Sequence, residues 1–479
     1  MHSMSILSEK LVVQPIFISL VHLDIFMGPC RYGFGEQLSY EYEKNASEIK
    51  LSQFNNEIKE FVVSDNIELL DTKYLEWHED FAVKEKALSA VLENDPRVDV
   101  YLISGTRLIS YLSTIIAKRT NKPIAFCPLS TNPYSRLGGI DASAHLFALE
   151  YKEVYNALNY EELNRMFRIL YVRKALSKTK ILYGIRNNVL SFGCVSSFID
   201  LSDITNRFGT EILNFNAMEF FKVLDELTDQ DIEEAKIITN DLVENANGVH
   251  MPAENVLNDV KFYIAVNKVM KQYDCNAFTL PCFEMCATQE LNKRELTFCL
   301  THSLLKDQGI PSACASDIGA IIAIEILMGL AKKAPHMGNC MVILDEMNNN
   351  TMRILHDVSS MYMKGYDNEP LPIDYVSFTK GNWGATMRYD FAKDVGQDMT
   401  MINLSPRMDK IMIAKGTITG CDDFLTQECK HAVRFSVNDS RDFHKKEASF
   451  GHHFAWVYGD YVDDIVEFSK VMGIEAVIA

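Results

Sequence analysis

Two aspartates and a pair of histidines stand where their side chains could meet in one site. Asp317 comes shortly after an apolar strand predicted at 310–314, and Asp345 directly follows a second apolar strand. In proteins that alternate strands with helices, catalytic and ligand-binding residues lie at such ends of strands and helices. His452 and His453 stand together close to the end of the sequence. Carboxylates and imidazoles gathered from separate segments are ligands for divalent metals, so the sequence predicts a divalent-metal site.

The segment 303–345 supplies the elements that would position both aspartates. It reads as a helix end, the strand at 310–314, a long apolar helix at 317–331 and a second strand at 341–344. An aspartate that precedes a helix caps free backbone N–H groups and interacts favourably with the helix dipole. The residue types alone therefore leave two roles open for Asp317, one chemical and one structural.

The first two thirds of the sequence alternate strands with helices. The clearest unit is a strand at 98–104, a helix at 107–119 and a strand at 123–127. Both strands are nearly continuous apolar runs, as expected of parallel strands covered on both faces. A long helix is predicted at 143–178. No G-x-G-x-x-G motif surrounds Gly105 at the first turn, so the sequence does not predict a dinucleotide site.

The character of the sequence changes from about residue 339. Short β-rich runs follow, separated by turn-prone residues, which is typical of an antiparallel barrel or sandwich. A final helix is predicted at 462–472. The predicted fold class is α/β, with two Rossmann-like α/β domains at 1–175 and 176–338 followed by a β-rich, barrel-like domain at 339–479.

Composition limits the classes of partner. The net charge of −18 and the lack of a basic run argue against nucleic acid, whose phosphates need clustered Lys and Arg. Eleven cysteines are scattered without the paired spacing of a zinc site. The sequence has no apolar run of about 18 residues and no secretory leader. These features predict a cytoplasmic protein with reduced thiols, no membrane span, and a small neutral or metal-bound substrate.

Three motifs carry a family resemblance. They are GIPSACASDIGA (309–320), VILD (342–345) and, near the end, GHHFAWVYGDY (451–461) with VMGIE (471–475). Together they resemble the L-fucose isomerase and L-arabinose isomerase superfamily over roughly the last 200 residues, whereas the earlier part shares only the strand–helix alternation. The resemblance implies a three-domain subunit, assembled as a homotrimer or homohexamer with active sites at subunit boundaries. It also implies aldose–ketose interconversion through an enediol, with bound Mn²⁺ or another divalent metal.

The resemblance also assigns site residues. Asp345 falls where the family has a metal-binding carboxylate at a strand end, and we expect it to act in proton transfer together with Asp317. The histidine ligand near the terminus corresponds to His452 or His453. His356 resembles an additional histidine ligand of the arabinose isomerase branch, and a purely structural histidine is the alternative there.

Strand alternation distinguishes the two terminal histidines. Successive side chains of a strand point to opposite faces, so only one of the pair can face the metal. His452 would share its face with the bulky Phe454 and Trp456, which suit a core. His453 lies beside the small Ala455, which leaves room for a ligand. We therefore predict that His453 is the ligand.

One position departs from the family pattern. The family segment reads approximately A-C-E-x-D, and its glutamate serves as metal ligand and acid/base; this chain has Ala315 in that place. Asp317 cannot simply replace the glutamate, because residues i and i+2 of a starting helix lie about 200° apart. Three explanations stay open: a shifted backbone recruits Asp317, the reaction has changed on a retained scaffold, or the chain carries an inactivating replacement.

The functional hypothesis is a metal-dependent aldose–ketose isomerase that acts on a small sugar or polyol. Two alternatives stay open, a metal-assisted carbon–carbon lyase or epimerase on a related polar substrate, and a non-catalytic sugar-binding or assembly protein. Bound metal would separate the enzymes from the binding protein, and the identity of the products would separate the two kinds of enzyme.

Overall fold

The computed structural model describes residues 4–23, 39–78, 85–106, 108–127, 133–186 and 200–479. Contacts divide the chain into two compact units, Lys10–Tyr171 and a larger one that joins Met1–Glu9 to Val172–Ala479. The predicted boundary between 338 and 339 falls inside the larger unit and stays a prediction. No helix of the described residues has the length and apolar character needed to cross a membrane.

The unit Lys10–Tyr171 is built on a six-stranded sheet in the order β2-β1-β4-β5-β6, with β3 also paired to β1. Every pairing is parallel, and β1 is buried along nearly its whole length, as the apolar runs predict. The strands are β1 (Leu11–Leu20), β2 (Ile67–Leu69), β3 (Lys73–Trp77), β4 (Val100–Gly105), β5 (Ile124–Phe126) and β6 (Val154–Asn156). The helices are α1 (Tyr40–Phe61), α2 (Glu85–Val91), α3 (Ser110–Thr120) and α4 (Pro133–Ala148).

The long helix predicted at 143–178 is wrong. Helix α4 ends at Ala148, and α5 (Tyr160–Lys178) begins only after β6. The chain leaves the helix through Glu150, which has a left-handed backbone (φ 60°), and β6 then extends the sheet beside β5. Apolar periodicity does not reveal this break, because the sheet edge that pairs with β6 is distant in sequence.

The larger unit begins with a four-stranded parallel sheet in the order β11-β10-β7-β8. Its strands are β7 (Lys180–Ile185), β8 (Glu211–Asn216), β10 (Ala277–Thr279) and β11 (Ser312–Ala313). The predicted second Rossmann-like region is therefore confirmed as a parallel α/β layer. Its helices are α6 (Leu201–Phe208), α7 (Glu219–Asp225), α8 (Asp229–Glu244), α9 (Ala253–Gln272), α10 (Cys282–Cys286), α11 (Glu290–Arg294), α12 (Cys299–Asp307) and α13 (Ile318–Ala331).

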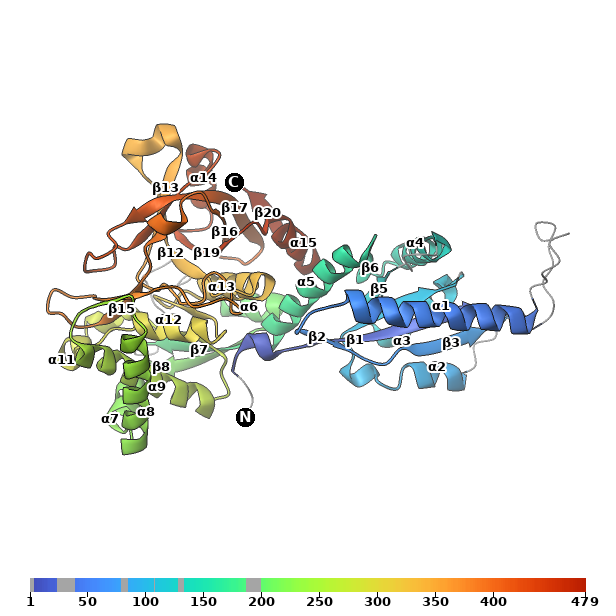
Figure 1. The fold of residues 1–479 in the computed structure, drawn as a ribbon, viewed down its shortest axis with the longest axis horizontal. Coiled ribbons are helices and arrows are strands. Elements are labelled where there is room, and N and C mark those ends of the chain that lie inside the picture. Colours follow the sequence, from blue (N-terminus) through green and yellow to red (C-terminus); the bar gives the residue numbers. More distant parts are fainter. Residues whose placement is uncertain (1–3, 24–38, 79–84, 107, 128–132, 187–199) are drawn as a thin grey trace. The chain divides into compact units, whose positions relative to one another are not determined.

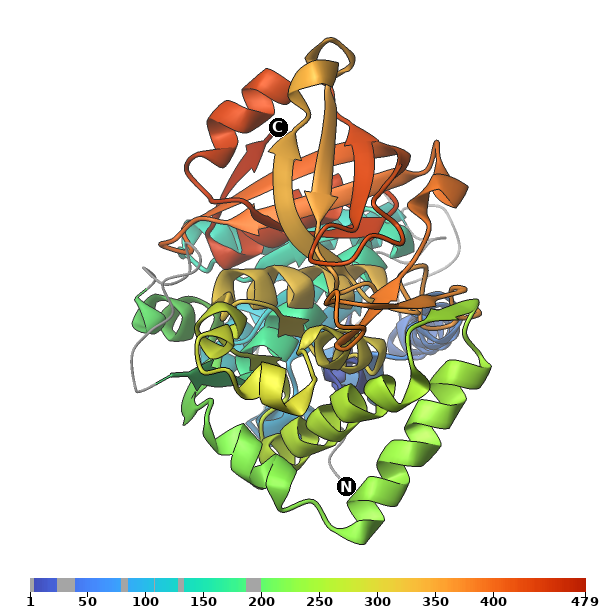
Figure 2. The same ribbon diagram turned by 90° about the vertical axis from the view of Figure 1, so that its left-hand side faces the viewer.

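The predicted barrel is also confirmed. Six antiparallel strands close in the order β16-β19-β12-β13-β18-β17, because β16 pairs with β17. In Figure 2 the β12–β13 hairpin (light orange) stands among the darker orange and red strands. The strands are β12 (His336–Val342), β13 (Thr351–Leu355), β16 (Asp398–Leu404), β17 (Lys410–Asp422), β18 (Ala432–Ser436) and β19 (His453–Tyr458). Outside the barrel lie β9 (Gly248–His250), β14 (Asp374–Ser377), β15 (Ala385–Arg388), β20 (Glu475–Ile478), α14 (Ser440–Glu447) and α15 (Val462–Met472).

Helix α13 connects the parallel sheet to the barrel. All of its residues are buried, and it contacts β10 and β11 as well as the barrel strands β16 and β19 (Figure 1). One hydrophobic core continues from the sheet, with Phe278 and Leu182, into the barrel, with Phe454 and Trp456. The start of α13 is therefore held in a fixed position between the carboxyl ends of the sheet strands and β19.

Burial of an acidic side chain in α13 predicts a pH-dependent stability. Glu325 is fully buried; its Oε1 accepts a hydrogen bond from Thr179 Oγ1 at 2.6 Å, and Oε2 has no partner among the described residues. Burial raises the pKa of Glu325 to about 8. A carboxyl group whose pKa is raised by folding contributes its full stabilisation at pH values below its ordinary pKa of about 4.5. This contribution is lost as the pH rises through the folded-state pKa of about 8.

We therefore expect Glu325→Gln to be close to wild type in unfolding free energy at pH 5 and more stable by a few kcal/mol at pH 9. The reason is that glutamine cannot ionise, and each pKa unit corresponds to about 1.4 kcal/mol. Urea unfolding at several pH values measures the difference. Glu219→Gln is the control, because Glu219 is only partly buried, and it should stay within about 0.5 kcal/mol throughout. Equal pH slopes for Glu325→Gln and wild type would contradict the prediction.

Candidate functional site

The site lies where parallel strands β7, β10 and β11 end. In a parallel sheet the carboxyl ends of neighbouring strands share one edge, and the segments that follow them line the crevice there. Ser316, which follows β11, donates a hydrogen bond from Oγ to the carbonyl of Gly184 in β7 at 3.2 Å. Thr279 of β10 donates from Oγ1 to the carbonyl of Ala313 at 2.7 Å. The turn from β11 into α13 is thereby attached to both neighbouring strands.

That turn has an unusual backbone. Ala315 (φ 60°) and Ser316 (φ 56°) are consecutive left-handed residues, a conformation that side chains other than glycine rarely adopt. Asp317 follows and is the N-cap of α13, so the predicted structural role of Asp317 is confirmed. Strain of this kind persists where the surrounding structure fixes it, often at functional sites. Here it lies at the position where the resembled family has its glutamate.

Asp317 also contacts the histidine from the end of the chain. The Nδ1 of His453 lies 2.7 Å from Asp317 Oδ2, and both side chains are buried. The other carboxylate oxygen accepts a hydrogen bond from the backbone N–H of Ala320 at 2.9 Å. A carboxylate accepts rather than donates, so the hydrogen of the imidazole sits on Nδ1 and Nε2 is the basic nitrogen.

His453 is the first residue of β19, and the strand places its neighbour elsewhere. His452 is exposed and lines a separate cavity of about 670 Å³ together with Cys340 and His444. Phe454 and Trp456 belong to the hydrophobic core. Of the two terminal histidines, His453 is thus the one that the structure brings to Asp317.

His356 lies beside this pair. It follows β13, and its ring centroid is 6.0 Å from that of His453. Its backbone N–H donates to the carbonyl of His431 at 3.0 Å, and its Nδ1 lies 3.5 Å from the Sγ of Cys429. Burial, followed by the nearby His453, holds the pKa of His356 well below its usual range. His356 is therefore a neutral imidazole.

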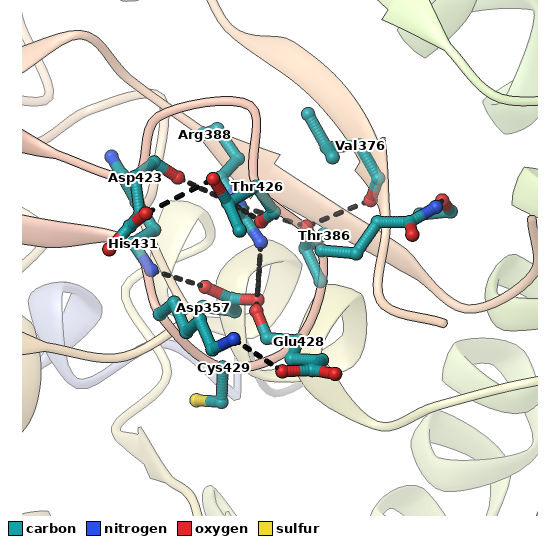
Figure 3. A network of polar contacts seen from close by, with 12 residues as sticks. Asp357, Val376, Thr386, Arg388, Asp423, Thr426, Glu428, Cys429 and His431 are labelled. Atoms are coloured by element: carbon teal, nitrogen blue, oxygen red, sulfur yellow. Dashed lines mark hydrogen bonds and ion pairs between the residues drawn. The ribbon is translucent and has the colours of Figure 1, made fainter. Parts of the chain in front are cut away.

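A buried arginine, Arg388, holds a network of polar contacts that includes Asp357, Thr426 and Glu428 (Figure 3). Arg388 is fully buried, and its Nη2 donates to Asp357 Oδ2 at 2.7 Å and to the carbonyl of Glu428 at 3.1 Å. Its Nη1 donates to the carbonyl of Thr426 at 2.6 Å. Asp357 directly follows His356, and Cys429 directly follows Glu428. No sequence motif marks this network, because its members come from three separate segments.

The predicted ligand Asp345 does not join the other site residues. The predicted end of the strand at 341–344 is wrong, because β12 stops at Val342. Asp345 is exposed and lies in the 3-10 turns of Leu344–Asn349. The chain leaves the strand there because it turns back into β13. The register pairs Asn339 of β12 with His453, so Asn339 and not Asp345 shares a face with the histidine.

The side chains at the site differ from the ligand set that the implied Mn²⁺ needs. A manganese ion prefers carboxylate oxygens in addition to imidazole. Within the described residues no group of three His, Cys, Asp or Glu side chains is placed to hold a metal ion. Asp345, His453 and His356 therefore do not fit a Mn²⁺ site as the chain is folded, and metal dependence stays a prediction from the resemblance alone.

Comparison with known proteins gives a distant similarity to a sugar isomerase. No protein-family model matches the sequence. The chain is 23% identical over 345 residues to the sulfoquinovose isomerases of Priestia aryabhattai and Priestia megaterium, which covers 69% of this chain and 71% of each relative. These matches do not confirm the resemblance to the fucose and arabinose isomerases.

Proposed function

We propose that the chain is an aldose–ketose isomerase that acts on a small sugar through an enediol. The observation that carries the proposal is the buried Asp317–His453 pair beside the neutral imidazole of His356. The distant similarity to sulfoquinovose isomerases supports the same reaction class. Isomerisation needs a base that reaches a C–H bond next to a carbonyl and a donor that stabilises the oxygen. The two histidines can supply these two groups.

His453 is the proposed base. Asp317 accepts the Nδ1 hydrogen, which fixes the ring and leaves the lone pair on Nε2. Nε2 has no hydrogen-bond partner among the described residues. In the proposed reaction the proton on C2 of the aldose passes to Nε2 and is returned to C1. A carboxylate behind the imidazole stabilises the imidazolium that exists between these two steps.

His356 is the proposed electrophile. A neutral imidazole can donate an N–H hydrogen bond to a carbonyl oxygen whose charge grows as the enediol forms. The low pKa of His356 keeps it neutral at physiological pH. While the carbon proton moves, the hydroxyl proton at O2 is transferred to O1, so that the aldehyde becomes an alcohol and the alcohol a ketone. His356 would polarise these oxygens.

The test is proton NMR of sugars incubated with the protein in D₂O. Sulfoquinovose is the first candidate substrate because it is the sugar in the name of the relatives. Pentoses and deoxyhexoses follow. We expect conversion of an aldose to a ketose with deuterium at the exchanged carbon, and no conversion by His453→Ala. Absence of conversion of every sugar in the panel by the folded protein would overturn the proposal.

The same spectra distinguish the alternatives. An epimerase would exchange deuterium but return an aldose, a lyase would give two shorter products, and a sugar-binding protein would shift resonances without products. A sugar that is cleaved rather than isomerised would favour the lyase. The products therefore identify the reaction class without any assumption about a metal.

Metal dependence and assembly are separate proposals. Elemental analysis of protein grown with added Mn²⁺ tests the first, with Asp345→Ala and His453→Ala as variants. Stoichiometric Mn²⁺ that both substitutions remove would support the resemblance.

Light scattering tests assembly as a homotrimer or homohexamer, and microscopy of a tagged chain tests the cytoplasmic location.

A further inference from the structure

Two cysteines next to the candidate site lie almost within bonding distance. The Sγ atoms of Cys282 and Cys314 are 3.4 Å apart. The register of the parallel strands β10 and β11 pairs Thr279 with Ala313; Cys314 directly follows β11, and Cys282 opens α10 shortly after β10. A disulfide needs sulfur atoms about 2.05 Å apart. The pair must therefore close by about 1.4 Å, the scale of a side-chain torsion change.

The two thiols differ in how they hold a proton. The hydrogen bond with Cys314 lowers the pKa of Cys282, and backbone N–H groups act in the same direction against burial. The hydrogen bond with Cys282, followed by burial, raises the pKa of Cys314 well above its ordinary value. Cys282 therefore carries more thiolate character, and Cys314 keeps the shared proton. The thiolate is the form of cysteine that attacks an oxidant.

The difference in burial between the two cysteines also favours Cys282 as the residue that reacts first. Cys282 is half-buried and precedes Phe283, whose side chain is 78% exposed, whereas Cys314 is buried. Cys282 is thus the less buried residue of the two, and Cys314 is the second thiol. Cys286, on the same short helix, is exposed, but burial of its thiol group raises its pKa. Cys286 is therefore a matched control, because the residue is exposed to solvent but its pKa is raised rather than lowered.

We propose that Cys282 and Cys314 form a peroxide-reactive dithiol that closes into a disulfide at the edge of the candidate site. In the first step the Cys282 thiolate attacks one oxygen of hydrogen peroxide and the O–O bond breaks. The hydroxide that leaves takes up the proton that Cys282 had released and departs as water, and a sulfenic acid remains on Cys282. In the second step the Cys314 sulfur attacks the Cys282 sulfur, and a second water leaves with the thiol proton. Two thiols and one peroxide thus give one disulfide and two waters.

The experiment uses the full-length reduced protein and one equivalent of hydrogen peroxide. We expect the intact mass to fall by two hydrogen atoms and a non-reducing peptide map to join the peptides of Cys282 and Cys314. In Cys314→Ala the reaction should be slower, because the hydrogen bond that lowers the pKa of Cys282 is lost, and it should stop at sulfenic acid on Cys282, which a 1,3-dione reagent traps. Cys282→Ser should slow peroxide consumption by about tenfold or more, and Cys286→Ser should leave it unchanged.

Two results would overturn the proposal. One is a wild-type peptide map in which Cys282 and Cys314 remain reduced while another cysteine is oxidised. The other is equal peroxide consumption by Cys282→Ser and wild type. The wild-type map needs no variant, so a poorly folded Cys314→Ala protein would not affect it. Because both readouts are masses and rates of thiol oxidation, they are independent of the proposed isomerase activity.

Discussion

Asp317→Asn is expected to lower the isomerase rate by about 10²–10⁴-fold while the unfolding free energy stays within about 0.5 kcal/mol of wild type. The two effects separate because Asp317 has two tasks. Its Oδ1 caps α13 by accepting from Ala320 N–H, and its Oδ2 accepts from His453 Nδ1. Asparagine is as good a helix cap as aspartate, so the cap survives.

The loss of rate follows from the tautomer of the imidazole. Once the single oxygen of asparagine caps the helix, its NH₂ group faces His453 and can only donate. Nδ1 must then accept, which moves the imidazole hydrogen to Nε2 and removes the basic lone pair from the nitrogen that should take the C2 proton. A buried carboxylate is also no longer present to stabilise the imidazolium.

Rates and urea unfolding on the same preparations check this prediction. Asp317→Ala should lose about 1 kcal/mol of stability as well as the rate, because the cap is removed. Asp439→Asn is the matched control, since Asp439 caps α14 through Arg441 and Asp442 N–H groups and is exposed. An Asp317→Asn enzyme with a rate within a few-fold of wild type would show that His453 is not the base.

Sequence reasoning predicted the elements whose signals are local. The cap Asp317 and the apolar run after it define α13. The choice of His453 over His452 as a metal ligand stays a prediction, although His453 is the histidine that lies beside Asp317. Parallel strands appeared as apolar runs because both faces are covered. These signals need only neighbouring residues, which is why the two α/β regions and the barrel were predictable.

The rest depends on contacts between distant segments. Asp345 was placed at a strand end, but the turn into β13 ends β12 three residues earlier, and register brings Asn339 opposite His453 instead. Register between strands separated by more than a hundred residues cannot be obtained from the pattern of either strand. The position of His356 likewise depends on Arg388, which is far from it in sequence.

Arg388→Met is expected to destabilise the larger unit by about 3–5 kcal/mol at pH 8, the largest stability change we predict. Arg388 and Asp357 are both fully buried, so the variant leaves an uncompensated carboxylate. The carbonyls of Asp423, Thr426 and Glu428 also lose their donors. Arg388→Lys should recover only part of the loss, because an ammonium group lacks the planar fork that serves several acceptors.

The pH dependence of this loss distinguishes a buried charge from a packing defect. Burial raises the pKa of Asp357 to about 6 even though the guanidinium of Arg388 opposes it. A carboxyl group with a raised pKa contributes its full stabilisation at pH values below its ordinary pKa of about 3.8. That contribution is lost as the pH rises through the folded-state pKa. Without Arg388 the folded pKa moves higher still, so the penalty grows from pH 5 to pH 8.

Urea unfolding of wild type, Arg388→Met and the double variant Arg388→Met/Asp357→Asn at pH 5 and pH 8 measures that growth. Because asparagine cannot ionise, we expect the double variant to be more stable than Arg388→Met at pH 8, and its unfolding free energy to change less between pH 5 and pH 8 than that of Arg388→Met. A destabilisation of Arg388→Met that is equal at both pH values would mean that lost packing dominates. In that case the Asp357 carboxylate would not be the group whose charge Arg388 balances beside His356.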